Sequence, residues 1–245
     1  MEYRLPPALA ARAHAFAEAG GVPVEPRLAS TVVLMRDPFE AYLIRRVATM
    51  AFAASMYVFP GGGVDPRDSA VTMTDPWGDR LGRDEATARA IVCAAVREVF
   101  EESGVLLAGH DAASVIADVS GPDWESARLD LIDRKLGFAE FLADRGLVLR
   151  SDLLTPWSRW ITPEFEPRRF DTYFFVAALP LGQRTRDVGG EADATAWCAP
   201  ADATDGRYTM LPPTQVTLTE LAEFSRVEDV FAAPRDAKNP IRPSF

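Results

Sequence analysis

The chain has 245 residues, of which 48% are hydrophobic and 25% charged, as in ordinary soluble globular proteins with a full hydrophobic core. The formal net charge is −10, only two lysines occur, and the arginines are scattered, which excludes a broad basic surface for nucleic acid. No run approaches the roughly 18–20 apolar residues of a membrane span, and residues 1–21 lack the apolar core of a signal peptide. We therefore expect a cytoplasmic protein with no nucleic-acid or membrane partner.

The first third of the chain predicts one helix and then short strands. The helix covers residues 8–19, and the strand candidates are residues 30–35, 41–44 and 56–59. The first two strands flank Asp37-Pro38, a turn signal, and predict a hairpin. The third runs into Pro60-Gly61-Gly62-Gly63, which predicts a sharp turn because glycine tolerates unusual backbone angles. Residues 65–82, rich in Asp, Pro and Gly, predict an inserted loop.

A helix is predicted from Asp84 to Ser103. Asp84 is a typical N-cap, and Ile91 and Val99 belong to an apolar stripe at helical spacing. Gly104 matches a glycine helix stop. Cys93 falls within this apolar stripe, and its spacing from the other cysteine indicates neither a disulfide framework nor a zinc site.

The second half predicts helices, then strands, then helices. Residues 112–146 are predicted to be helical in pieces. The strand candidates that follow are residues 157–161, 170–179 and 194–198. Two helices are predicted at the end of the chain, over residues 211–224 and 226–233. This order predicts a single α/β domain over residues 1–245, with a mixed sheet between helices. Residues 27–105 form its first half, residues 106–150 a helical insertion, and residues 151–235 its second half.

Three carboxylates lie at i, i+3 and i+4 near the end of the predicted central helix. Glu98, Glu101 and Glu102 would share one helix face, where like charges repel by a few tenths of a kcal/mol per pair. The helix macrodipole also disfavours negative charge just before Gly104. A hard divalent cation would turn this repulsion into ligation, because carboxylate oxygens are its preferred ligands.

The run from Arg97 to Val105 resembles the second half of the Nudix box, R-E-U-x-E-E-x-G-U with U aliphatic, and Phe59-Pro60-Gly61-Gly62 resembles the sequence that opens it. The resemblance implies a Nudix-like α/β/α sandwich with a mixed sheet and a helical insertion. It also implies cleavage of the diphosphate linkage in a nucleoside diphosphate joined to another group. A homodimer is a further expectation from the family.

The box departs from the family pattern in its first half. The usual glutamate lies six residues after the glycine and eight before the arginine, positions held here by Asp68 and Arg89. Gly62 and Arg97 lie 35 positions apart (97 minus 62), more than twice the usual separation, so a loop insertion splits the box. Such split boxes resemble the branch that includes coenzyme A diphosphatases. Asp65, Asp68 and Glu85 are the candidates for the displaced acid.

The resemblance, together with the preference of hard cations for oxygen, assigns Mg²⁺ or Mn²⁺ to Glu98, Glu101 and Glu102. The backbone carbonyl of Gly62 is a further candidate ligand. Either Glu98 or Glu102 would double as the general base. Arg97 is expected to orient a carboxylate through a bidentate pair.

Residues outside the box are candidates for other roles. Glu191 is the first choice for an additional acid, with Glu164 and Glu166 as competitors. Arg168 and Arg169 precede an aromatic strand and are candidates for phosphate contact.

Arg46 resembles an arginine of the motif that precedes the box in coenzyme A hydrolases. Two other positions depart from that motif: Ala51 stands where the motif has arginine, and Ser55 stands where it has glycine. The alternative function is a Nudix-fold nucleotide-binding or regulatory module with weak catalysis, motivated by Arg89 at the glutamate position.

Overall fold

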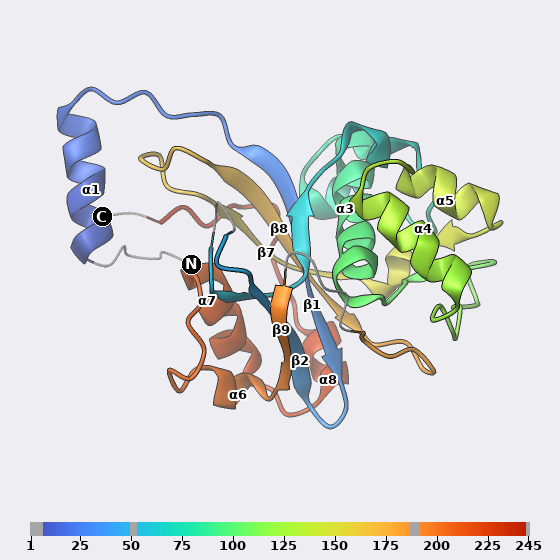
Figure 1. Ribbon diagram of the computed structural model, residues 1–245. Helices are drawn as coiled ribbons and strands as arrows, with labels where there is room; N and C mark the ends of the chain where they lie inside the picture. The colour runs from blue at the N-terminus through green and yellow to red at the C-terminus, as the bar shows by residue number, and fades with distance from the viewer. Residues whose placement is uncertain (1–6, 50–52, 187–191, 244–245) are drawn as a thin grey trace.

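A mixed β-sheet forms the centre of the protein in the computed structural model, which describes residues 7–49, 53–186 and 192–243 (Figure 1). Its strand order is β3-β2-β1-β8-β7, with β4 also paired to β1 and β9 to β2. The strands are β1 (Arg27–Arg36), β2 (Glu40–Arg46), β3 (Tyr57–Val58), β4 (Gly61–Gly63), β7 (Thr155–Ile161), β8 (Phe170–Ala178) and β9 (Ala192–Cys198).

Strand β1 is the central strand and is buried on both faces. It runs parallel to β8 on one side and antiparallel to β2 and β4 on the other. Val32 and Leu34 enter the hydrophobic cluster on one face, while Val33 and Met35 enter the cluster on the opposite face. Burial of successive residues explains the continuous apolar run in the sequence.

Helices cover both faces of the sheet (Figure 1). The helices are α1 (Pro7–Glu18), η1 (Pro66–Ala70), α2 (Gly78–Leu81), α3 (Glu85–Ser103), α4 (Pro122–Ile132), α5 (Phe138–Asp144), η2 (Ser151–Leu153), α6 (Pro200–Ala203), α7 (Pro212–Leu221) and α8 (Val227–Ala232). α3, α4 and α5 lie on one face, and α6, α7 and α8 on the other. None of the helices within the described ranges is long and apolar enough to cross a bilayer.

The limits of α3 follow from the residues that flank it. The Asp84 carboxylate accepts a hydrogen bond from the backbone N–H of Thr87 at 2.9 Å, which caps the first turn. Gly104 adopts φ +70°, and its N–H donates to the carbonyl of Phe100. Both the predicted start and the predicted stop of the helix are therefore confirmed.

The segment from residue 106 to 150 packs on the same core as the sheet. Phe141 of α5 stacks on Phe100 of α3, with ring centroids 5.3 Å apart. A short two-stranded sheet joins the ends of the segment, pairing β5 (Ala108–Gly109) with β6 (Val148–Leu149). The predicted helices are present as α4 and α5, whereas residues 112–121 are not helical.

The prediction of a sharp glycine turn at residues 60–63 was wrong. Gly61, Gly62 and Gly63 form strand β4, which pairs with residues 29–31 of β1. A Cβ on Gly61 would lie 2.5 Å from the carbonyl oxygen of Ser30, so glycine is needed for close approach between strands. Residues 65–82 contain η1 and α2, which the loop prediction missed, and α6 was also missed.

Candidate active site

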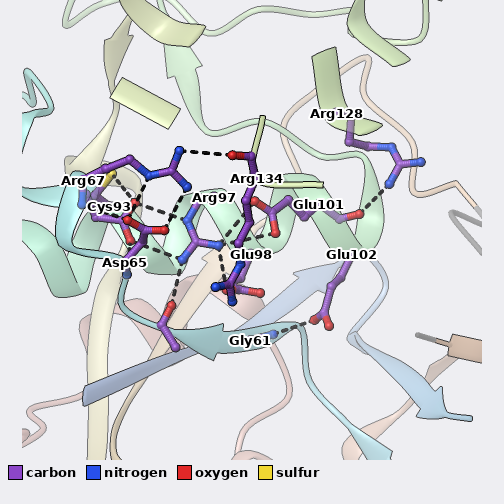
Figure 2. Close-up of polar contacts among 12 residues, drawn as sticks. Gly61, Asp65, Arg67, Cys93, Arg97, Glu98, Glu101, Glu102, Arg128 and Arg134 are labelled. Carbon is purple, nitrogen blue, oxygen red and sulfur yellow. Dashed lines mark hydrogen bonds and ion pairs between the residues drawn. The ribbon is translucent and has the colours of Figure 1, made fainter. Parts of the chain in front are cut away.

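Two of the predicted carboxylates of α3, those of Glu98 and Glu102, face the glycine strand β4 (Figure 2). Glu102 Oε2 accepts a hydrogen bond from the backbone N–H of Gly61 at 2.7 Å. A Cβ on Gly62 would lie 2.5 Å from Glu98 Oε1, so a side chain there would displace the carboxylate. The structure thus brings a backbone strand without side chains against the acidic face of a helix.

Arg97 lies at the centre of this cluster and is 12% exposed. Its Nε and Nη2 donate to Asp68 Oδ1 and Oδ2, each at 3.2 Å. Its Nη1 donates to Glu98 at 2.7 Å and to both carboxylate oxygens of Glu101 at 3.3 Å. Its Nη2 also donates to the carbonyl of Gly63 at 2.8 Å. Such contacts hold several carboxylates in fixed positions, the geometry expected of an orienting residue.

Among the three candidates for the displaced acid, Asp68 is the one that accepts hydrogen bonds from Arg97. It lies six residues after Gly62, where the family has glutamate. It is 1% exposed and also accepts hydrogen bonds from Cys93 Sγ at 3.6 Å and from the N–H of Asp65 at 2.8 Å. The insertion therefore leaves the first-half acid beside the second-half arginine. Asp68 lies in the segment for which the sequence predicted an inserted loop, but the η1 turn there buries its side chain.

The other two candidate acids have different partners. Asp65 pairs with Arg67 at 2.9 Å. Glu85 accepts hydrogen bonds from the backbone N–H groups of Trp77 and Gly78, at 3.1 and 2.7 Å. Both therefore order the segment between β4 and α3.

Arg89 stands at the second possible position of the family glutamate. Its Nη1 donates to the carbonyl of Val71 at 3.1 Å. This contact ties the inserted segment to α3.

Burial alters the acid–base properties of the cluster. It raises the pKa of Glu98 to about 7, against the charge of Arg97, and the Glu101 carboxylate adds to the rise. Burial also raises the pKa of Glu101, again opposed by Arg97. For Arg97, burial acts to lower the pKa, but Glu98 and Asp68 outweigh it, so the guanidinium stays charged.

The C-terminal end of α3 carries compensating cations. Arg128 of α4 donates from Nη1 to the carbonyl of Glu101 at 2.7 Å. The backbone N–H of Arg186 donates to the carbonyl of Ser103 at 2.9 Å, and its guanidinium donates to the carbonyl of Gly104 at 3.4 Å. Arginine at the C-terminal carbonyls of a helix offsets the negative end of the macrodipole, which disfavours the nearby acids. No sequence motif marks these two arginines, because each comes from a distant segment.

The donor set matches a hard divalent cation. Glu98, Glu101, Glu102 and the Gly62 carbonyl offer only oxygen atoms, and the absent Cβ at Gly62 leaves the strand open to the carboxylates. The described residues contain no preassembled group of three or more acidic, His or Cys ligands. Arg97 donates to Glu98 and Glu101, while the backbone N–H of Gly61 donates to Glu102.

The arginines outside the box that were predicted to bind substrate differ in their burial and partners. Arg169 is 6% exposed and donates to the carbonyls of Thr162 and Val24, so its guanidinium is committed to backbone. Arg168 is exposed in the same turn before β8. Arg46 ends β2 opposite Ala192 of β9.

Among the candidate acids outside the box, Glu166 pairs with Arg12 of α1 at 3.0 Å. Glu164 lines a cavity between α1 and the turn that joins β7 to β8. Glu191, the first choice, and Ala51 lie outside the described residues.

Comparison with known proteins assigns the family. The model of the NUDT19 Nudix domain matches residues 78–218, more than half of the chain. The chain belongs to the NUDT19 Nudix family. This Nudix domain is similar in structure to the crystal structure of a NUDIX hydrolase from Alicyclobacillus acidocaldarius, with a TM-score of 0.73 and 27% identity over 89% of this chain and 99% of that one. The predicted Nudix-like fold is confirmed.

The chain is also similar in sequence to curated proteins. A putative nudix hydrolase 7 of Caenorhabditis elegans is 29% identical over 88% of this chain and 66% of its own length. An acyl-coenzyme A diphosphatase NUDT19 of Xenopus laevis is 22% identical over 78% of this chain and 62% of its own length. The Nudix domain therefore spans slightly less than two thirds of these relatives.

Proposed function

We propose that this Nudix domain hydrolyses the diphosphate linkage of a nucleoside diphosphate joined to another group, using Mg²⁺ or Mn²⁺. The supporting observation is the contact between the acidic face of α3 and strand β4, with Arg97 fixed by Asp68. Coenzyme A or an acyl derivative is the proposed substrate class, since relatives carry the name acyl-coenzyme A diphosphatase. Because Ser55 stands where the coenzyme A motif has glycine, other diphosphates should be tested as well.

Glu98, Glu101, Glu102 and the Gly62 carbonyl are the residues proposed to hold the metal. Bound there, a divalent cation would neutralise phosphate charge and acidify the attacking water. Glu98 and Glu102 are the two candidates for general base.

The direct test is a substrate panel analysed by mass spectrometry. Coenzyme A, acyl-coenzyme A, ADP-ribose, a dinucleotide and a nucleotide sugar are each incubated with the protein and Mg²⁺ or Mn²⁺. We expect at least one to give two products that each keep one phosphorus of the original diphosphate, and EDTA to stop the reaction. Absence of turnover across the panel, with a rise in melting temperature on ligand binding, would support the binding-module alternative instead.

Variants test the role of the acidic face. Glu102→Gln keeps an oxygen that accepts from Gly61, so the fold should persist while kcat falls by roughly 10²- to 10⁴-fold. Glu228→Gln is the control, because Glu228 is exposed on α8 and its carboxylate pairs only at the surface. Equal turnover by the two variants would contradict the site assignment.

A further inference from the structure

We infer that Arg134, in the turn between α4 and α5, binds the diphosphate group of the substrate. This inference rests on the proposed function. Arg134 comes from the segment between the two halves of the fold, and neither the box nor its flanking motif includes it. Figure 2 shows it beside Glu101 at the acidic cluster.

The backbone around Arg134 is fixed in place by hydrogen bonds. Arg134 adopts φ +58°, a left-handed conformation rare outside glycine, and its N–H donates to Leu131. The N–H of Lys135 donates to Asp130 at 2.8 Å. Arg67 Nη1 donates to the carbonyl of Arg134 at 3.4 Å, which links the turn to η1 beside the site.

The charge of Arg134 is available, unlike that of its neighbours. Arg97 is held by carboxylates, and Arg67 is held by Asp65. The Arg134 side chain is exposed, and within the described residues its guanidinium forms no ion pair.

A diphosphate approaching the acidic face meets repulsion from Glu98, Glu101 and Glu102. A guanidinium at the rim offsets this repulsion and offers a planar pair of donors that matches phosphate oxygens. The competing explanation is that Arg134 only balances the charge of the acids. That role would affect metal binding and would leave the affinity for the diphosphate unchanged.

Kinetics on the best substrate of the panel separate the two roles. Charge-assisted hydrogen bonds contribute about 1.5–3 kcal/mol, so Arg134→Ala should raise KM roughly 10- to 100-fold while kcat stays within about threefold. Arg134→Lys should recover part of the loss. Lys135→Ala is the matched control, because Lys135 is an exposed cation in the same turn and is paired with Asp133 at 2.7 Å.

A second measurement does not depend on turnover. Calorimetry with ADP in the presence of Mg²⁺ should show a comparable rise in Kd for Arg134→Ala and none for Lys135→Ala. Arg134→Asn repeats both experiments with a residue that tolerates positive φ, which separates loss of the guanidinium from strain in the turn.

The outcomes distinguish the inference from the proposed function. If wild-type protein hydrolyses a substrate and Arg134→Ala and Arg134→Asn each keep its KM within twofold, the inference is overturned and the proposed function stands. Weaker Mg²⁺ binding with unchanged Kd for ADP also overturns it, in favour of charge balance. If wild-type protein hydrolyses nothing, the proposed function fails, and the ADP titrations alone decide whether Arg134 binds a diphosphate.

Discussion

Asp68 and Arg97, 29 residues apart in the chain, are joined by two hydrogen bonds of 3.2 Å in a nearly fully buried ion pair. The pair joins the two halves of the split Nudix box across the inserted segment. It also fixes the guanidinium that holds Glu98 and Glu101, so the insertion changes the path of the chain without separating the groups at the site.

Removal of the Asp68 carboxylate should destabilise the fold. Asp68→Ala leaves the buried charge of Arg97 without its two-bond partner, and we expect a loss of about 3 kcal/mol in the free energy of unfolding by urea. Asp65→Ala is the comparison, because Asp65 pairs with the more exposed Arg67 and caps η1, and should cost about 1 kcal/mol. Similar losses in both variants would argue against a special role for the buried pair.

The shorter acid at position 68 is matched to Cys93. The two side chains are buried and 3.6 Å apart, so the extra methylene of Asp68→Glu should overpack this space and cost about 1–3 kcal/mol. Cys93→Ala removes the sulfur atom and should relieve the crowding. The double variant should therefore be more stable than the sum of the single effects predicts, by about 0.5 kcal/mol or more in urea unfolding. Strict additivity would show that the two positions are independent.

Two adjacent glycines provide a matched test of the strand at the site. Gly62→Ala places a methyl group against Glu98, so we expect the catalytic rate to fall at least about tenfold, since small displacements at reacting groups are costly. Its stability should change less, because the obstructed atoms end a side chain that can rotate. A Cβ on Gly63 meets open space, and Gly63→Ala should keep near-normal activity. Steady-state kinetics on both variants check this, and equal losses would contradict it.

Stability of the metal-free protein should depend on pH through Glu98. Its folded pKa, about 7, lies above the ordinary value of 4.5, so between these two the folded state binds the extra proton. The stabilisation from protonated Glu98 is therefore complete below about pH 4.5 and is lost as pH rises to about 7. Urea unfolding in EDTA from pH 4.5 to 7.5 should show this fall. Glu98→Gln should flatten it, and an unchanged slope in that variant would assign the effect to other groups.

The sequence by itself determined the local features of this Nudix domain. Asp84 and Gly104 set the limits of α3 because capping depends on residues within one helical turn. The spacing of Glu98, Glu101 and Glu102 placed the acids on one face for the same reason, since helical periodicity is local.

Only the tertiary structure decided which groups meet that acidic face. Gly61–Gly63 became a strand because β1 supplies the hydrogen-bonding partner, which the tripeptide alone does not reveal. Asp68 became the partner of Arg97 because folding of η1 against α3 buries both. Arg134 reached the site through the turn after α4. Such contacts depend on the packing of segments far apart in the chain, and no local pattern of residues encodes that packing.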